Sequence, residues 1–182
     1  MIRIITPLLF STTLSIAFAQ TDSYTLKLQS GEFTLSNNAE GLTNAKVAEW
    51  PAFNDQRFGV VRLGTYPTNE EWSTLSEMGI KNLGYVPNRS FMVSIANGSD
   101  LNAINQYEVL ASSGYESDFK GVLDVDFAPE RAKQDNEYLF NTHFFASINM
   151  NMALASLRAA GAEVIQLEEK MGYALIKANA EE

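Results

Sequence analysis

Apolar and polar residues alternate most clearly from position 58 onward. The stretch FGVVRLGTY, residues 58–66, predicts a strand that Pro67 ends. Thr68 stands three residues before Glu71, which is the spacing of a capping box and predicts the start of a helix. Gly79 is suited to end that helix. Its predicted apolar face consists of Trp72, Leu75 and Met78.

The elements that follow complete a simple order of strands and helices. Residues 80–86 (IKNLGYV) and 90–96 (SFMVSIA) predict two strands joined by a tight turn. Ser99 can cap a short second helix, and a last strand is expected within YEVLASSGY, residues 107–115. The order β-α-β-β-α-β predicts an α+β, ferredoxin-like unit, an antiparallel sheet with its helices on one face. The aromatic residues Trp72, Tyr85 and Phe91 fall at expected core positions of this unit.

The same pattern returns 82 positions later, which predicts a tandem repeat. Aligned without a gap, Phe58 falls on Phe140, Leu75 on Leu157 and Phe91 on Tyr173. The alternative is that two unrelated α+β units share this spacing by chance. The second unit shows β-α-β-β and lacks the last helix and strand, which would leave an unpaired sheet edge. We therefore expect an incomplete second unit and a chain that continues beyond Glu182.

The N-terminus predicts export. MIRIITPLLFSTTLSIAFA has one early positive charge, an apolar run and small residues at its end, which is typical of a secretory signal peptide; a retained N-terminal anchor is the alternative. We expect a secreted or periplasmic protein with no membrane contact after cleavage. The predicted organisation is a signal peptide (1–19), a leader and loop with one short strand (20–56), a first ferredoxin-like unit (57–118), a connector (119–137) and a truncated second unit (138–182).

Charge and composition narrow the possible partners. The chain has 13 Lys and Arg residues against 22 Asp and Glu residues, a net charge of −9, which argues against binding to nucleic acid or to an anionic membrane. It contains no cysteine, which excludes cysteine catalysis and thiolate metal sites. We expect no cofactor.

Candidate catalytic chemistry is sparse. His143 is the only histidine and falls in a predicted apolar strand, where a structural role is the simpler interpretation; a small enzyme using His143 with a nearby carboxylate is the alternative. Asp124 and Asp126 could contact a cation, or they could be solvated residues at a strand end. No nucleophile elbow, P-loop or dinucleotide motif occurs. We therefore expect no catalytic or metal site in this chain.

The stretch VVRLGTYPTNEEWSTLSEMGIKNLGYVPNRSFMVSI resembles the N-terminal prodomain region of secreted subtilisin-like serine proteases, the peptidase S8 family. The shared features are Pro67 and Trp72 at the helix start, Gly79 at its end, and the turn Tyr85-Val86-Pro87-Asn88. The family's catalytic strings D-(S/T)-G, H-G-T and G-T-S-M-A are absent. The resemblance implies a prodomain that templates the folding of a subtilisin-like catalytic domain and inhibits it.

The expected contact with that protease domain is the sheet face opposite the helices. If Phe91, Val93 and Ile95 point into the core, their strand neighbours point outward. The predicted contact patch is Val60, Arg62, Met92 and Ser94. The main alternative to a prodomain is a stand-alone secreted binding or protease-inhibitor module.

Overall fold

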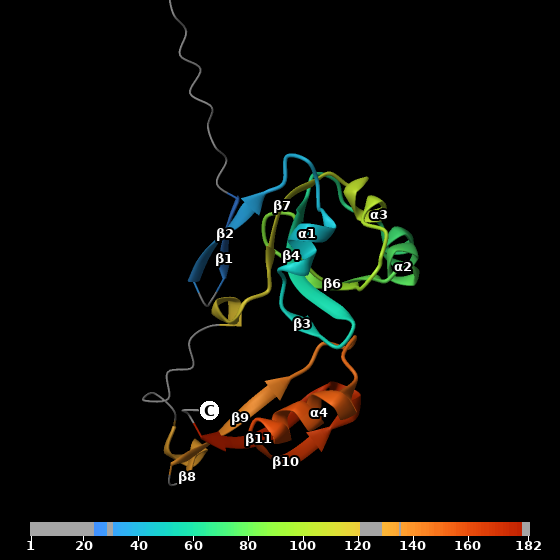
Figure 1. Cartoon of the computed structure of the whole chain (residues 1–182). Coiled ribbons are helices and arrows are strands. Elements are labelled where there is room, and N and C mark those ends of the chain that lie inside the picture. Colours follow the sequence, from blue (N-terminus) through green and yellow to red (C-terminus); the bar gives the residue numbers. More distant parts are fainter. Residues whose placement is uncertain (1–23, 29–30, 121–128, 135, 180–182) are drawn as a thin grey trace, which may run out of the picture.

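A computed structural model describes residues 24–28, 31–120, 129–134 and 136–179, which form two antiparallel sheets and four α-helices (Figure 1). The predicted α+β class with antiparallel sheets is confirmed. The predicted signal peptide, Asp124 and Asp126 lie outside these residues.

The larger sheet has seven strands. Six of them run in the order β1-β2-β7-β4-β6-β5, with every neighbouring pair antiparallel, and the short β3 pairs with β4. The strands are β1 (Tyr24–Leu28), β2 (Gly31–Asn37), β3 (Ala52–Phe53), β4 (Gln56–Leu63), β5 (Ile80–Val86), β6 (Ser90–Ala96) and β7 (Val109–Gly114). The helices that accompany this sheet are α1 (Asn44–Ala48), α2 (Asn69–Glu77) and α3 (Asn102–Asn105).

Helix α2 begins and ends as its sequence predicts. The Thr68 side chain accepts a hydrogen bond from the Glu71 amide at 3.3 Å, and the Glu71 carboxylate accepts one from the Thr68 amide at 2.7 Å. These bonds satisfy amides that have no partner within the helix. Gly79 follows the helix at φ 86°, a conformation that costs glycine little.

The main core lies between the larger sheet and its helices. Its members include Leu63 and Val93, which are fully buried, and Ile104 of α3. Trp72 packs against this core but is only partly buried. Further buried members are Val61, Leu75, Ile80, Phe91, Ile95, Leu101, Tyr107 and Val109.

A second core covers the opposite face of the same sheet. The β1–β2 hairpin folds back over this face, as Figure 1 shows at its left side, and buries Leu26 and Leu35. Phe33 of β2 stacks on Phe119 with ring centroids 4.5 Å apart. Residues 20–56 are therefore not only a leader and loop, because they supply two strands of the sheet and helix α1. The predicted strand at 24–28 is confirmed, whereas β2 and α1 were missed.

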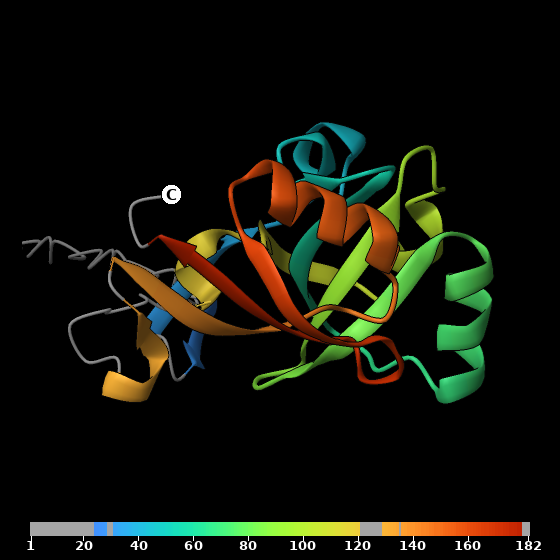
Figure 2. The same cartoon turned by 90° about the horizontal axis from the view of Figure 1, so that it is seen from below.

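The smaller sheet has four strands in the order β10-β11-β9-β8, again antiparallel. The strands are β8 (Lys133–Gln134), β9 (Glu137–His143), β10 (Glu163–Glu168) and β11 (Tyr173–Asn179). Helix α4 (Met150–Ala159) packs on one face and buries Leu154 with Ala174 and Ile176 of β11. Figure 2 shows this sheet and α4 next to the larger sheet. Short 3-10 turns η1 (Ser117–Lys120), η3 (Glu130–Ala132) and η4 (Glu169–Met171) complete the described structure.

The β-α-β-β order of β4, α2, β5 and β6 recurs in β9, α4, β10 and β11, and both sheets place these strands in the same spatial order. Each second hairpin also carries a bulge, between Asn82 and Gly84 in one sheet and between Val164 and Gln166 in the other.

The gapless alignment of the two units is wrong. Thr68 and Asn149 are matching N-caps, 81 residues apart, whereas Gly79 and Gly161 follow the two helices at an offset of 82. Helix α4 is one residue longer than α2, and the β10–β11 turn adds one more residue. The core partner of Val93 is therefore Ile176, not Leu175. One inserted residue in a turn exchanges the two faces of the following strand, so Tyr173 and Leu175 point away from α4.

Candidate binding site between the two sheets

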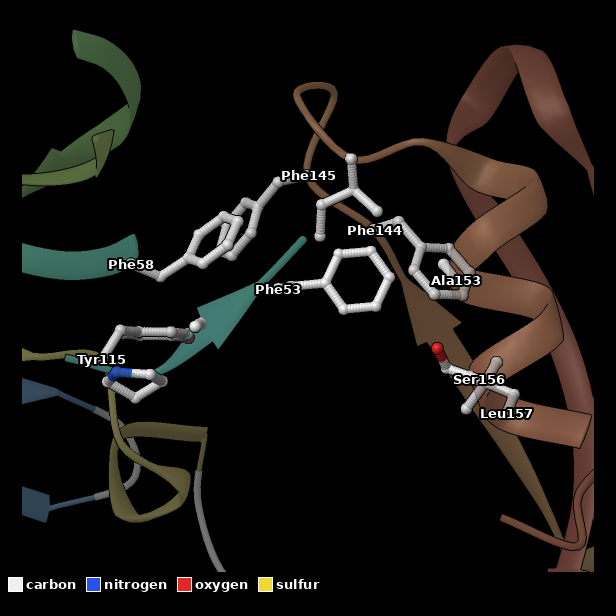
Figure 3. Close-up of a pocket in the computed structure, with 11 residues that line it drawn as sticks. Phe53, Phe58, Tyr115, Phe144, Phe145, Ala153, Ser156 and Leu157 are labelled. Atoms are coloured by element: carbon white, nitrogen blue, oxygen red, sulfur yellow. The ribbon is translucent and has the colours of Figure 1, made fainter. Parts of the chain in front are cut away.

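An apolar pocket of about 370 Å³ lies where the two sheets meet (Figure 3). The smaller unit contributes two adjacent phenylalanines, Phe144 and Phe145, and one side of α4. The larger unit contributes the β3 region and the starts of its neighbouring strands. The lining residues are Pro51, Ala52, Phe53, Phe58, Tyr115, Phe144, Phe145, Ile148, Ala153, Ser156 and Leu157.

Backbone hydrogen bonds fix the loop that carries the two phenylalanines. The Phe144 amide donates to the Gly172 carbonyl at 2.7 Å, and the Ile148 amide donates to the Phe145 carbonyl at 2.9 Å. Asn149 then begins α4, because its side chain accepts a hydrogen bond from the Met152 amide at 3.2 Å. The loop between β9 and α4 is therefore short and defined, and it holds both rings at the pocket.

Aromatic contacts join the loop to the larger sheet. The ring of Phe145 stacks on Phe58 with centroids 6.1 Å apart and meets Tyr115 edge-on at 5.9 Å. The Phe58 amide donates to the Pro51 carbonyl at 2.9 Å, which holds the β3 region beside β4. These contacts form the wall that Figure 3 shows opposite α4.

The lining can bind apolar groups but offers little for acid–base chemistry. It contains no carboxylate, lysine, arginine or histidine, and its side-chain polar atoms are the hydroxyls of Ser156 and Tyr115. Burial raises the pKa of the Tyr115 hydroxyl, so this group is neutral at physiological pH. An apolar lining with very few polar groups is typical of a binding pocket.

The pocket occupies a place that is filled in the larger unit. On α4 it is lined by Ala153, Ser156 and Leu157. At the 82-residue offset these match Glu71, Thr74 and Leu75 of α2, which border the groove between α2 and α3. The pocket therefore lies on the side of α4 where a counterpart of α3 would pack. No such helix is present among the described residues of the smaller unit.

The sequence-predicted contact patch lies on the expected face but is largely inaccessible. Val60 and Ser94 are each only 1% exposed, because the β1–β2 hairpin covers this face. The expectation that they point to solvent is wrong. Met92 is half-buried in the same core, and the Arg62 guanidinium lies 4.9 Å from the centre of the Tyr24 ring. The alternation of Phe33 and Leu35 in GEFTLSN was the signal that could have revealed the covering strand.

The aromatic residues assigned to the core differ in burial. Phe91 is buried and contacts both other rings, with centroids 5.2 Å from Trp72 and 5.5 Å from Tyr85. Tyr85, however, is 59% exposed, so its assignment to the core is wrong. It lies on β5, an edge strand of the sheet, where little packs over it.

His143 lies at the exposed end of β9, on the sheet face opposite α4. Its ring centroid is 5.3 Å from that of Tyr173, whose hydroxyl donates to the Asn141 side chain at 2.8 Å. Within the ranges that the structure describes, no group of three or more acidic or histidine side chains is placed to hold a metal ion. No helix in the same ranges is long and apolar enough to span a membrane.

Comparison with known families gives one match. Residues 27–116 match the family model of a domain of unknown function, DUF8729. The matched segment runs from β1 to the residues just after β7, so it spans the larger sheet and its three helices. No curated protein and no solved structure matches the chain.

Proposed function

We propose that this chain is a secreted, noncatalytic binding protein made of two ferredoxin-like units, the second incomplete. The order β7-β4-β6-β5 around α2 and α3 supports this description of the first unit, and the recurrence of β-α-β-β supports that of the second. Following the resemblance to subtilisin prodomains, we propose that its partner is a subtilisin-like catalytic domain, which it helps to fold and inhibits. A stand-alone secreted binding or inhibitor module is the second candidate.

One observation carries the binding role: the sheet face opposite α4 presents apolar side chains that are not fully buried. Leu175 and Tyr173 of β11 are half-buried, and Ile165 of β10 is 49% exposed. At the rim, the Lys177 ammonium lies 3.0 Å from the carboxylates of Glu137 and Glu163. An apolar centre with a charged rim is the usual composition of a protein–protein contact.

The proposed contact surface therefore moves from the first unit to the second. The corresponding face of the larger sheet, with Val60 and Ser94, is covered by the protein's own hairpin. Charged substitutions there would disrupt the fold before they could report on a partner.

The test is a titration of a subtilisin-like catalytic domain with the purified chain, read out with a fluorogenic peptide. The chain alone should not hydrolyse the peptide, and it should inhibit the protease. Leu175→Glu combined with Ile165→Glu should weaken inhibition at least tenfold, because two charges would be buried without partners. Met78→Glu, at a position 50% exposed on the first unit, is the matched control and should leave inhibition unchanged.

Two results would contradict parts of this proposal. Unchanged inhibition by the folded double variant would exclude the second sheet face as the contact. Absence of any binding to several subtilisin-like domains would favour a stand-alone module with another partner.

A further inference from the structure

We infer that the apolar pocket and the open edge of β9 together form a docking site for a helix–strand segment of a partner polypeptide. Two apolar side chains of the helix would enter the pocket, and the strand would pair with β9. The site uses the α4 side of the second unit, not the opposite face assigned to the protease, and so does not rest on the proposed function.

The first unit shows what such an occupant looks like. After β6 the chain forms α3, which buries Leu101 and Ile104 beside α2, and then β7. Strand β7 pairs with β4 along residues 59–63. Because α4 lines the pocket with the residues that match the α3-facing side of α2, the second unit presents the same receiving surface.

The strand edge supplies the second half of the site. In the smaller sheet the position of β7 is taken by β8, which pairs with only Glu137 and Tyr138 of β9. Within the described structure, residues 139–143 have a strand partner only on the β11 side. An edge of this kind accepts an added strand through main-chain hydrogen bonds.

The pocket's size and chemistry fit side chains from a helix. An apolar cavity of roughly 150 Å³ holds one benzene ring, so a pocket of about 370 Å³ has room for about two leucine-sized groups. Its lining would reject charged groups, because they would lose hydration without a partner. A small apolar molecule could fill the pocket but would leave the edge of β9 unpaired, which is why the combined site favours a polypeptide.

The probe is a fluorescein-labelled synthetic peptide of residues 97–116, which carries the α3 and β7 sequence. Its binding to the full chain is followed by fluorescence anisotropy. Ser156→Phe places a ring at the mouth of the pocket and should weaken binding at least tenfold. Ala155→Phe is the matched control, because this neighbouring position is exposed and does not line the pocket; it should change binding less than twofold.

Hydrogen exchange tests the strand half separately. Saturating peptide should slow amide exchange at residues 139–143, whereas a peptide with Ile104→Asp should neither bind nor protect them. Three results would overturn the inference: no saturable binding at millimolar peptide, binding that Ser156→Phe leaves unchanged, or filling of the pocket without protection of β9. The last would indicate a site for small apolar molecules only.

Discussion

The two units follow the same β-α-β-β path but bury it to different degrees. The sheet of the first unit is covered on both faces, by α2 and α3 on one side and by the β1–β2 hairpin on the other. The sheet of the second unit has one helix, and many residues of its core, such as Phe140 and Leu157, are only partly buried. A shared backbone path therefore does not give shared stability, since stability follows the apolar area removed from water.

One matched pair of positions shows how each unit solves the same packing problem. Gly59 on β4 faces Val93, and Phe140 on β9 faces Ile176, so the two residues occupy equivalent places. In the first unit the ring of Trp50, which follows α1, lies directly on Gly59. The described part of the second unit has no α1 counterpart, and Phe140 supplies the bulk itself.

The largest expected effect comes from truncating the matched leucines on the two helices. Leu75 is 2% exposed in the main core, so Leu75→Ala should cost about 3–4 kcal/mol. Leu157 is half-buried at the pocket, so Leu157→Ala should cost about 1–2 kcal/mol. The measurement is urea unfolding of each variant, followed by circular dichroism.

Fluorescence provides the control for this comparison. Both tryptophans, Trp50 and Trp72, belong to the first unit. Leu75→Ala should shift the fluorescence transition, and Leu157→Ala should shift it little. Equal losses of stability in the two variants would show that the second unit is packed as tightly as the first.

The next effect tests the contact of Trp50 with the sheet. In Gly59→Ala the added Cβ would overlap the Trp50 ring and lie 2.6 Å from its Cδ2 atom, so the ring must move. Overpacking of this kind should cost about 1–3 kcal/mol. The variant should also expose Trp50 and shift its emission to longer wavelength.

Trp50→Leu in the same chain is the control for that result. The smaller side chain should relieve the overlap, so the double variant should be more stable than the sum of the two single losses predicts. Purely additive losses would mean that Gly59 is needed for another reason.

The sequence predicted those elements whose signals are local. Helix α2 was predicted from its capping box, its apolar face and Gly79. The faces of β11 were not, because the residue added in the β10–β11 turn leaves the alternation of β11 intact and only exchanges its faces. The burial of Val60 was missed for a different reason. It depends on the fold of a hairpin more than twenty residues away, which a reading of one strand does not include.

The pocket was beyond prediction because no single segment contains it. Phe144 and Phe145 look like the end of an apolar strand, and Phe53 and Tyr115 look like isolated aromatic residues. Their meeting depends on how the two units pack together. The gap beside α4, in contrast, follows from the missing helix and strand that the sequence pattern did indicate.

The smallest expected effect distinguishes the two helix starts by their response to pH. Hydrogen bonds from the Thr68 backbone and side chain lower the pKa of Glu71, which also faces the Tyr107 hydroxyl. A lowered pKa means that this carboxylate stabilises the fold above the usual glutamate range and that the contribution is lost as pH falls through that range and below it. Asn149 caps α4 without a carboxylate, since Met152 stands where Glu71 stands in α2. Unfolding midpoints compared between about pH 6 and about pH 3 should therefore fall further in the natural protein than in Glu71→Gln. Met152→Glu should introduce the same dependence at α4, and identical pH profiles for all three proteins would show that the capping box contributes nothing measurable.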